Sequence, residues 1–151
     1  MFSKISISAI GKTTKEFQEI ENNYLKQIKT KISMQIHNHL SYLSKEEQIE
    51  KESLQLQKDK SNSEWTVLLD KDGIQLSSED FTKKLNDWTS SAKIIRFIIG
   101  GSYGVSEELK KSSNFILSFS KATFPHQLAR IILLEQIYRS ETILSGSKYH
   151  K

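Results

Sequence analysis

Hydrophobic and polar residues follow two different periods along this chain, one typical of strands and one typical of helices. Alternating positions and short apolar runs predict strands over residues 2–10, 32–36, 65–69, 94–99 and 115–119. Apolar residues three and four positions apart predict helices over residues 13–28, 44–60, 77–88, 105–111 and 125–144. Because strands and helices alternate, we expect a three-layer α/β domain with a mostly parallel sheet.

Local signals refine the ends of these elements. Thr13 followed by Glu16, and Ser44 followed by Glu47, have the spacing of a capping box and predict helix starts. The run Asp70-Lys71-Asp72-Gly73 predicts a turn after the third strand. A single proline and six glycines leave little room for a linker, so residues 1–151 are expected to form one domain.

Composition excludes several classes of protein. With no cysteine, the chain has no disulfide framework, no thiolate nucleophile and no zinc ribbon. No stretch approaches the roughly 18 apolar residues of a membrane span, and the N-terminal residues lack the pattern of a signal peptide. We therefore expect a soluble, cytoplasmic protein without a membrane partner.

The net charge of +4 is unevenly distributed. Residues 1–90 carry 13 lysines against 14 acidic residues, whereas residues 91–151 carry 9 basic residues against 4 acidic ones. Polyanions such as nucleic acids prefer a basic surface of this kind, although a small excess of charge also serves solubility alone.

Two segments are candidates for chemistry. Gly100-Gly101-Ser102-Tyr103-Gly104 follows a predicted strand, where ligands of α/β sheets bind, but a structural turn explains it equally well. Residues 118–127 bring hydroxyls, a lysine and His126 to the start of the last helix, where free N–H groups attract anions. The alternative for this second segment is a well-capped helix start.

Other patterns are less specific. Ile131-Ile132-Leu133-Leu134 is apolar on more than one face of its helix, which suits either a dimer interface or a buried core. Arg130 and Arg139 lie in the same helix and can be ordinary surface cations. His37 and His39 have no further ligand-type residues nearby, so we expect no metal site.

Longer stretches resemble a known family. Residues 97–104 (FIIGGSYG), residues 117–130 (LSFSKATFPHQLAR) and residues 134–139 (LEQIYR), with the ending Tyr149-His150-Lys151, resemble the ribosomal RNA large subunit methyltransferase H family of the SPOUT superfamily. The resemblance is dense from Val67 onward and weaker over residues 12–64. Ser53, Ile74 and Lys151 depart from the residues common in that family.

The resemblance implies a C-terminal trefoil knot, a homodimer, and S-adenosylmethionine as the cofactor. It also implies methylation at N3 of a pseudouridine in 23S ribosomal RNA on the assembled ribosome. The positions that match its cofactor-binding residues are Leu69, Gly100, Phe119, Ser120, Lys121, Ala122, Thr123 and Phe124.

The closing residues are the candidates for catalysis. Methylation of a protonated nitrogen needs a base, or a cation that stabilises the anion. Within this group His150 can take the proton, Arg139 can stabilise charge and Tyr149 can contact the base, with His126 as an alternative base, and the sequence leaves open which residue takes the proton. Two other functions stay open, namely a catalytically silent RNA- or ribosome-binding module and a SPOUT methyltransferase acting on transfer RNA.

Overall fold

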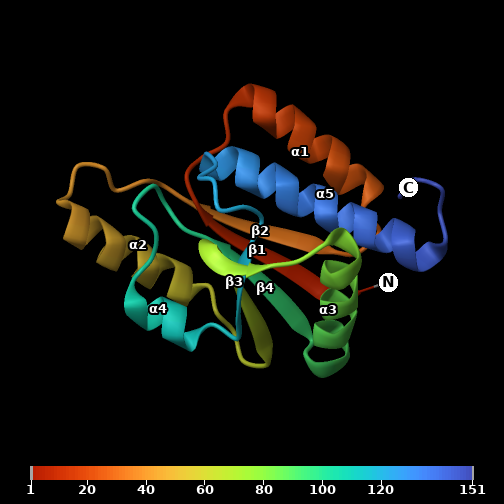
Figure 1. Ribbon diagram of the computed structural model, residues 1–151. Helices are drawn as coiled ribbons and strands as arrows, with labels where there is room; N and C mark the ends of the chain where they lie inside the picture. The colour runs from red at the N-terminus through yellow and green to blue at the C-terminus, as the bar shows by residue number, and fades with distance from the viewer. Residues whose placement is uncertain (1, 151) are drawn as a thin grey trace.

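Five parallel strands run through the middle of the computed structural model, which describes residues 2–150 of the chain (Figure 1). Their order across the sheet is β2-β1-β4-β3-β5, and every neighbouring pair is parallel. Their bounds are Lys4–Ile10 for β1, Ile32–His37 for β2, Glu64–Gln75 for β3, Ile94–Ile99 for β4 and Phe115–Ser118 for β5.

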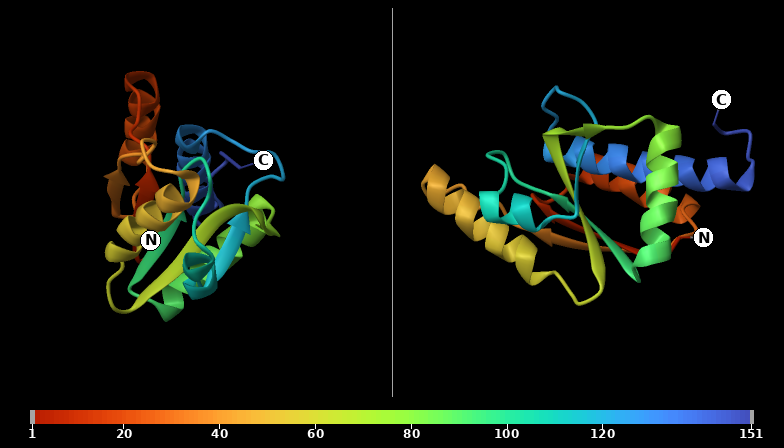
Figure 2. Two further views of the ribbon diagram at one scale, coloured as in Figure 1. Left: turned by 90° about the vertical axis from the view of Figure 1, so that its left-hand side faces the viewer. Right: turned by 60° about the horizontal axis from the view of Figure 1, so that its bottom comes forward.

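Helices cover both faces of the sheet, so the predicted α/β fold with a parallel sheet is confirmed. The helices are α1 (Lys15–Gln27), α2 (Lys45–Lys58), α3 (Ser78–Ser91), α4 (Glu107–Ser112) and α5 (His126–Ser145). On one face α5 packs between α1 and α3, while α2 and α4 lie on the other (Figures 1 and 2). None of the helices described in residues 2–150 is long and apolar enough to cross a membrane.

Two hydrophobic clusters follow from this layering. The larger cluster joins Ile7 and Phe97 of the central strands to Leu133 of α5, all of which are buried. The smaller one, on the other face, joins Leu68 to Leu56 of α2 and Leu109 of α4. Burial of large aliphatic side chains is the main source of stability in such clusters.

The turn predicted at residues 70–73 does not end the third strand. Leu69 and Ile74 both pair with Leu117 of β5, so the residues between them bulge out and β3 then resumes. Gly73 is required in this bulge, because a Cβ atom there would lie 2.6 Å from the carbonyl oxygen of Ile116. The prediction failed because tertiary pairing with β5 continues the strand beyond its local turn signal.

The capping box predicted at Thr13 is also absent from the described structure. Thr14 is the N-cap of α1, and its side chain makes no capping hydrogen bond. The Thr13 hydroxyl instead lies against Glu21 and Arg130. Arg130 is fully buried and paired with Glu21, so its interpretation as a surface cation is wrong.

Candidate functional site

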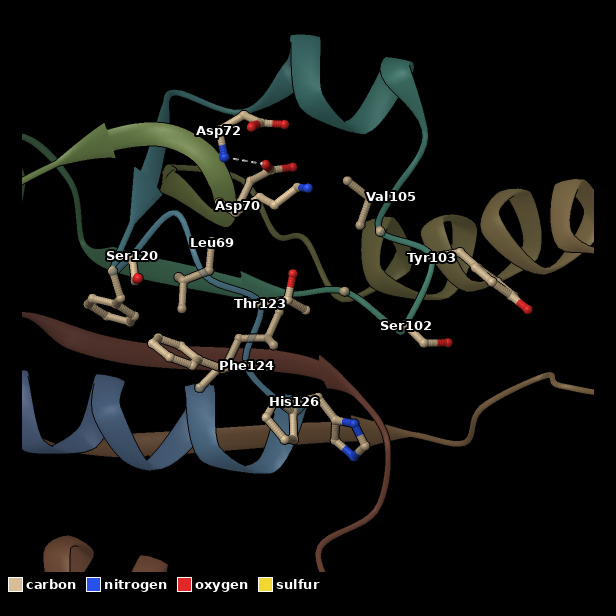
Figure 3. Close-up of a pocket in the computed structure, with 18 of the residues that line it drawn as sticks. Leu69, Asp70, Asp72, Ser102, Tyr103, Val105, Ser120, Thr123, Phe124 and His126 are labelled. Carbon is tan, nitrogen blue, oxygen red and sulfur yellow. Dashed lines mark hydrogen bonds between the residues drawn. The ribbon is translucent and has the colours of Figure 1, made fainter.

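A cavity of about 640 Å³ opens at the carboxyl ends of β3, β4 and β5 (Figure 3). Its volume lies within the range of roughly 300–1,000 Å³ common for small-molecule sites. The expected cofactor residues that line it are Leu69, Gly100, Phe119, Ser120, Ala122, Thr123 and Phe124. Lys121 is exposed and is not among the described residues that line the cavity.

The walls of the cavity differ in polarity. Leu69, Phe119 and Phe124 provide an apolar surface, and Figure 3 shows Leu69 and Phe124 on neighbouring sides of the cavity. Asp70 and Asp72, from the bulge in β3, add carboxylates at another part of the wall. Lys71 and Lys110 also line the cavity, so it suits a ligand with a flat apolar part and charged groups of both signs.

The glycine loop, residues 100–104, is a tight turn after β4. The Gly104 N–H donates to the Gly101 carbonyl at 3.0 Å, and Gly104 has a φ of 80°. At Gly100 a Cβ atom would lie 2.6 Å from Cγ1 of Val105, so internal packing already demands glycine there. Close approach of a ligand is therefore a second reason for this glycine rather than the first.

The segment after β5 is tied to the bulge of β3. The Ser118 hydroxyl lies 3.0 Å from the carbonyl oxygens of both Lys71 and Ser120 and can donate to either. The Ser120 hydroxyl in turn accepts from the Ala122 N–H at 3.0 Å. These contacts hold the loop between β5 and α5 over the cavity without a regular element.

His126 lies at the start of α5, on the edge of the cavity. Its ring meets the ring of His39 edge to face, with 4.7 Å between centroids, and a Cβ atom on Gly11 would collide with it. Burial, and then the nearby His39 and Arg130, lower the pKa of His126 below its usual 6.5. The ring is therefore neutral near pH 7, packed between neighbours in a way that favours a structural role.

His37 and His39 do not share a site. His37 Nε2 lies 2.7 Å from a carboxylate oxygen of Asp59, whereas His39 faces His126 and, at 3.8 Å, Glu52. Among residues 2–150 no group of three or more His, Asp or Glu side chains is arranged to hold a metal ion.

The three expected catalytic residues form one cluster at the C-terminal part of α5, with Arg139 in the helix and Tyr149 and His150 after it. Arg139 donates to Nδ1 of His150 at 3.0 Å and to Glu135 at 2.8 Å, and its guanidinium lies 4.9 Å from the centroid of the Tyr149 ring. Since Nδ1 accepts from Arg139, the proton of the neutral imidazole lies on Nε2, which is 2.7 Å from Glu79. Lys151, the last residue of this group in the resemblance, lies outside the described residues.

Electrostatics in this cluster keep the tyrosine neutral. Burial and the carboxylate of Glu135 raise the pKa of Tyr149, whose hydroxyl donates to that carboxylate at 3.0 Å. The hydrogen bond from His150 lowers the pKa of Glu79. Tyr149 therefore serves as a hydrogen-bond donor and a ring surface, not as a base.

Known proteins resemble this chain over almost its whole length. A family model of predicted SPOUT methyltransferases matches residues 3–150, which include both loops of the cavity and the C-terminal cluster. The chain belongs to the SPOUT methyltransferase family. The resemblance to the SPOUT superfamily found in the sequence is thereby confirmed.

Individual relatives extend this result. The chain is 46% identical to the ribosomal RNA large subunit methyltransferase H of Dictyoglomus thermophilum, over 97% of this chain and 98% of that protein. Proteins of the same name from Caldicellulosiruptor saccharolyticus and Acholeplasma laidlawii are each 39% identical, over 97% and 98% of this chain and 99% of their own lengths. The match therefore includes residues 12–64, where the motifs are sparse.

In this SPOUT methyltransferase α5 begins beside the cavity, whereas the C-terminal cluster lies toward the other end of the helix. His126 borders the cavity and Arg139 follows 13 positions later, which corresponds to about 20 Å along a helix. Within one chain the structure does not bring Arg139, Tyr149 and His150 to the expected cofactor residues.

Sequence reasoning missed Glu52, which supports the glycine loop from behind. Its buried carboxylate accepts from the Leu40 N–H at 2.9 Å and from the Gln48 side chain at 3.1 Å. A Cβ atom on Gly101 would collide with this carboxylate, so loop and helix are in close contact. The signal was available, since Gln48, Glu52 and the inward-facing Leu56 are four residues apart on α2.

Proposed function

We propose that this chain transfers a methyl group from S-adenosylmethionine to N3 of a pseudouridine in 23S ribosomal RNA, on the assembled ribosome. One observation carries the proposal. The two segments with the most specific resemblance, residues 97–104 and 117–130, supply much of the wall of one cavity at the carboxyl edge of the sheet. The printed names of the relatives, which refer to large-subunit ribosomal RNA, support the choice of substrate.

The residues of the cavity fit S-adenosylmethionine. The apolar surface of Leu69, Phe119 and Phe124 suits an adenine ring, and loop backbone groups can read its edge. The carboxylates of Asp70 and Asp72 suit a ligand that carries positive charge on a sulfonium and an amino group. Lys110 lies 3.9 Å from Asp70 and partly offsets its charge.

The reaction is an in-line displacement. When bound, the cofactor supplies an electrophilic methyl group to the target nitrogen. The target nitrogen would lose its N3 proton to a base and use that electron pair for the bond to the methyl carbon, with a neutral thioether as the leaving group. The protein therefore has to position the nitrogen in line and remove one proton.

The C-terminal cluster suits the removal of the proton. The lone pair on Nδ1 of His150 is held by Arg139, so His150 accepts the substrate proton only when that hydrogen bond opens. In the same step the freed guanidinium of Arg139 can turn to the developing negative charge on the base. Tyr149 can offer its ring or hydroxyl to the nucleotide.

We further propose that a second copy of the chain completes the site. Thirteen positions of α5, about 20 Å of helix, separate His126 at the cavity edge from Arg139 of the cluster in one chain, whereas methyl transfer needs the cavity and the cluster near the same atom. On α5 the side chains of Leu128, Ile131 and Ile132 remain at least partly exposed, while Leu133 and Leu134 are buried in the chain's own core. A symmetric dimer along this helix would cover the exposed side chains.

Incubation with labelled S-adenosylmethionine and whole ribosomes tests the proposed activity. We expect label at a single pseudouridine of 23S RNA, and much weaker labelling of protein-free RNA. Binding of the cofactor with no transfer to any RNA would favour the silent binding module. Label in transfer RNA instead would assign the chain to the other enzyme class.

A further inference from the structure

An exposed tyrosine and a nearby lysine stand at the edge of the cavity, and a second exposed tyrosine lies close to them in the sequence. Tyr103 belongs to the glycine loop, lines the cavity edge and is 52% exposed, and Figure 3 shows its ring pointing away from Leu69 and Thr123. Nζ of Lys45, the first residue of α2, lies 5.4 Å from the centroid of the Tyr103 ring. Tyr42 lies three residues before Lys45 and is 80% exposed.

The stability of the fold does not explain this group. The turn of the glycine loop is made by Gly101 and Gly104, and the outward position of Tyr103 adds little burial. A lysine in the first turn of a helix opposes the helix dipole, so Lys45 is also unfavourable for α2 itself. Residues that cost stability at the edge of a site commonly serve binding.

We propose that Tyr103, Lys45 and Tyr42 form a stacking surface for unpaired bases of the ribosomal RNA next to the target nucleotide. This inference rests on the proposed function. Proteins recognise single-stranded RNA by stacking splayed bases on aromatic rings, and a cation near the ring adds to the attraction. Tyr103 is both part of the cavity wall and part of this surface, so a base stacked there lies one step from the reacting nucleotide.

The contact is with bases rather than with phosphates. Glu46 and Glu47 follow Lys45 directly, and their negative charge offsets that of the lysine. A phosphate group would be repelled here, whereas a stacked base is neutral and has a π-face on each side. The ring of Tyr103 is therefore the decisive element, and Lys45 supports it.

Steady-state methylation of ribosomes by Tyr103→Ala and Tyr103→Phe tests the proposal. We expect the alanine variant to raise KM for ribosomes about tenfold, the size of one lost base–aromatic stack, with little change in kcat. The phenylalanine variant should keep the parent KM, because the ring face is retained. Tyr42→Ala should raise KM in the same direction.

Two further measurements and one control variant accompany the kinetics. The affinity for S-adenosylmethionine, by calorimetry, and the mass of the particle, by light scattering, should both equal those of the parent. Lys84→Ala is the matched control. Nζ of this lysine of α3 lies 5.7 Å from the centroid of the Phe115 ring of β5, which is a similar pair of a cation and an aromatic ring. We expect this control to keep the parent KM.

Several results would overturn the proposal. An unchanged KM for ribosomes in Tyr103→Ala, or an equally raised KM in Tyr103→Phe, would exclude base stacking on Tyr103. A change in particle mass would assign the tyrosines to contact between subunits, and a weaker cofactor affinity alone would assign Tyr103 to the cavity. If the parent protein labels no ribosomal RNA at all, the proposed function fails, and this inference with it.

Discussion

Gly100 lines the cavity and also packs against Val105, so a side chain there would have little room. A Cβ atom at this position would lie 2.6 Å from Cγ1 of Val105. Replacement of Gly100 therefore strains the packing of the loop even before any ligand binds. A loss of cofactor binding in Gly100→Val would not by itself show contact with the cofactor.

A pair of substitutions separates strained loop packing from lost contact with the cofactor as the cause of weaker cofactor binding. Gly100→Ala should destabilise the protein by about 1–3 kcal/mol through overpacking, measured by urea unfolding. Val105→Ala in addition should restore much of this stability, because the colliding Cγ1 is gone. If the Gly100 backbone also lies against the cofactor, the double variant stays weak in calorimetric binding of S-adenosylmethionine. Full recovery of affinity would leave Gly100 with a packing role alone.

His126 makes the stability of the protein depend on pH. Its pKa in the folded chain is below 6.5, first because of burial and then because of His39 and Arg130. The unfolded chain therefore takes up the proton more readily, so folding stability is full above about pH 6.5 and falls as the pH drops below it. The lowered pKa values of Glu64 and Glu79 act in a separate window, where carboxylates titrate, below about pH 4.5.

We expect His126→Gln to flatten this part of the stability profile. Urea midpoints measured between about pH 7.5 and pH 5.5 should fall less in the variant than in the parent. His150→Gln, at the far end of α5, is the control and should keep the slope that His126 causes. An equally steep fall in His126→Gln would show that another group is responsible.

The segment after α5 is held to the rest of the chain by polar contacts. Helix α5 ends at Gly146, whose φ is 72°, and the following residues turn back so that Tyr149 packs on Tyr138 and His150 reaches Glu79. Tyr138 packs against the larger hydrophobic cluster, but Tyr149 and His150 belong to neither cluster, so the segment can be altered without loss of the fold.

Removal of residues 149–151 should lower the rate of methyl transfer severely and leave cofactor affinity unchanged, because the cavity is at the other end of α5. His150→Ala should lower kcat and remove one limb of the pH–rate profile near neutrality if His150 is the base. A slow variant with the parent pH profile would assign His150 to positioning Arg139. Transfer at the parent rate after the deletion would exclude the whole segment from catalysis.

Separation of the cavity from the cluster has a consequence for the whole assembly. If each site takes its cavity from one chain and its cluster from another, two inactive variants can complement each other. Ala122→Trp should block the cavity, since Ala122 is exposed at the cavity wall and a large side chain there spares the core. Removal of residues 149–151 should inactivate the cluster.

Mixed in equal amounts and allowed to exchange subunits, these variants should regain about a quarter of the parent activity, because half of the dimers then hold one intact site of two. Each variant alone should be inactive, and light scattering should report a dimer at micromolar concentration. A monomer in solution, or no recovery on mixing, would contradict the shared site.

Much of the architecture was predictable from local pattern. The two periods of apolar residues located all five strands and all five helices described in residues 2–150. The residues on the buried face of each element recur at a short, regular spacing in the sequence, so the pattern is visible without the fold. Ser44 was predicted as a cap and accepts from the Glu47 N–H, a contact that depends on residues three apart. The motif around Gly100 also predicted the place of the cavity, since ligands bind at the carboxyl ends of parallel strands.

Tertiary structure alone decided where charged and polar groups are buried. Arg130 is fully buried because Glu21 and Thr13, more than a hundred residues earlier in the chain, satisfy its guanidinium. Glu52 faces inward because the Leu40 N–H donates to its carboxylate and the loop after β4 packs against it. The motifs named the residues of the cavity wall and of the C-terminal cluster, whose roles stay predictions, and the distance between these two groups depends on the length and course of α5. Periodicity describes which face of an element avoids water, whereas polar pairs and the spacing of sites depend on which distant elements meet.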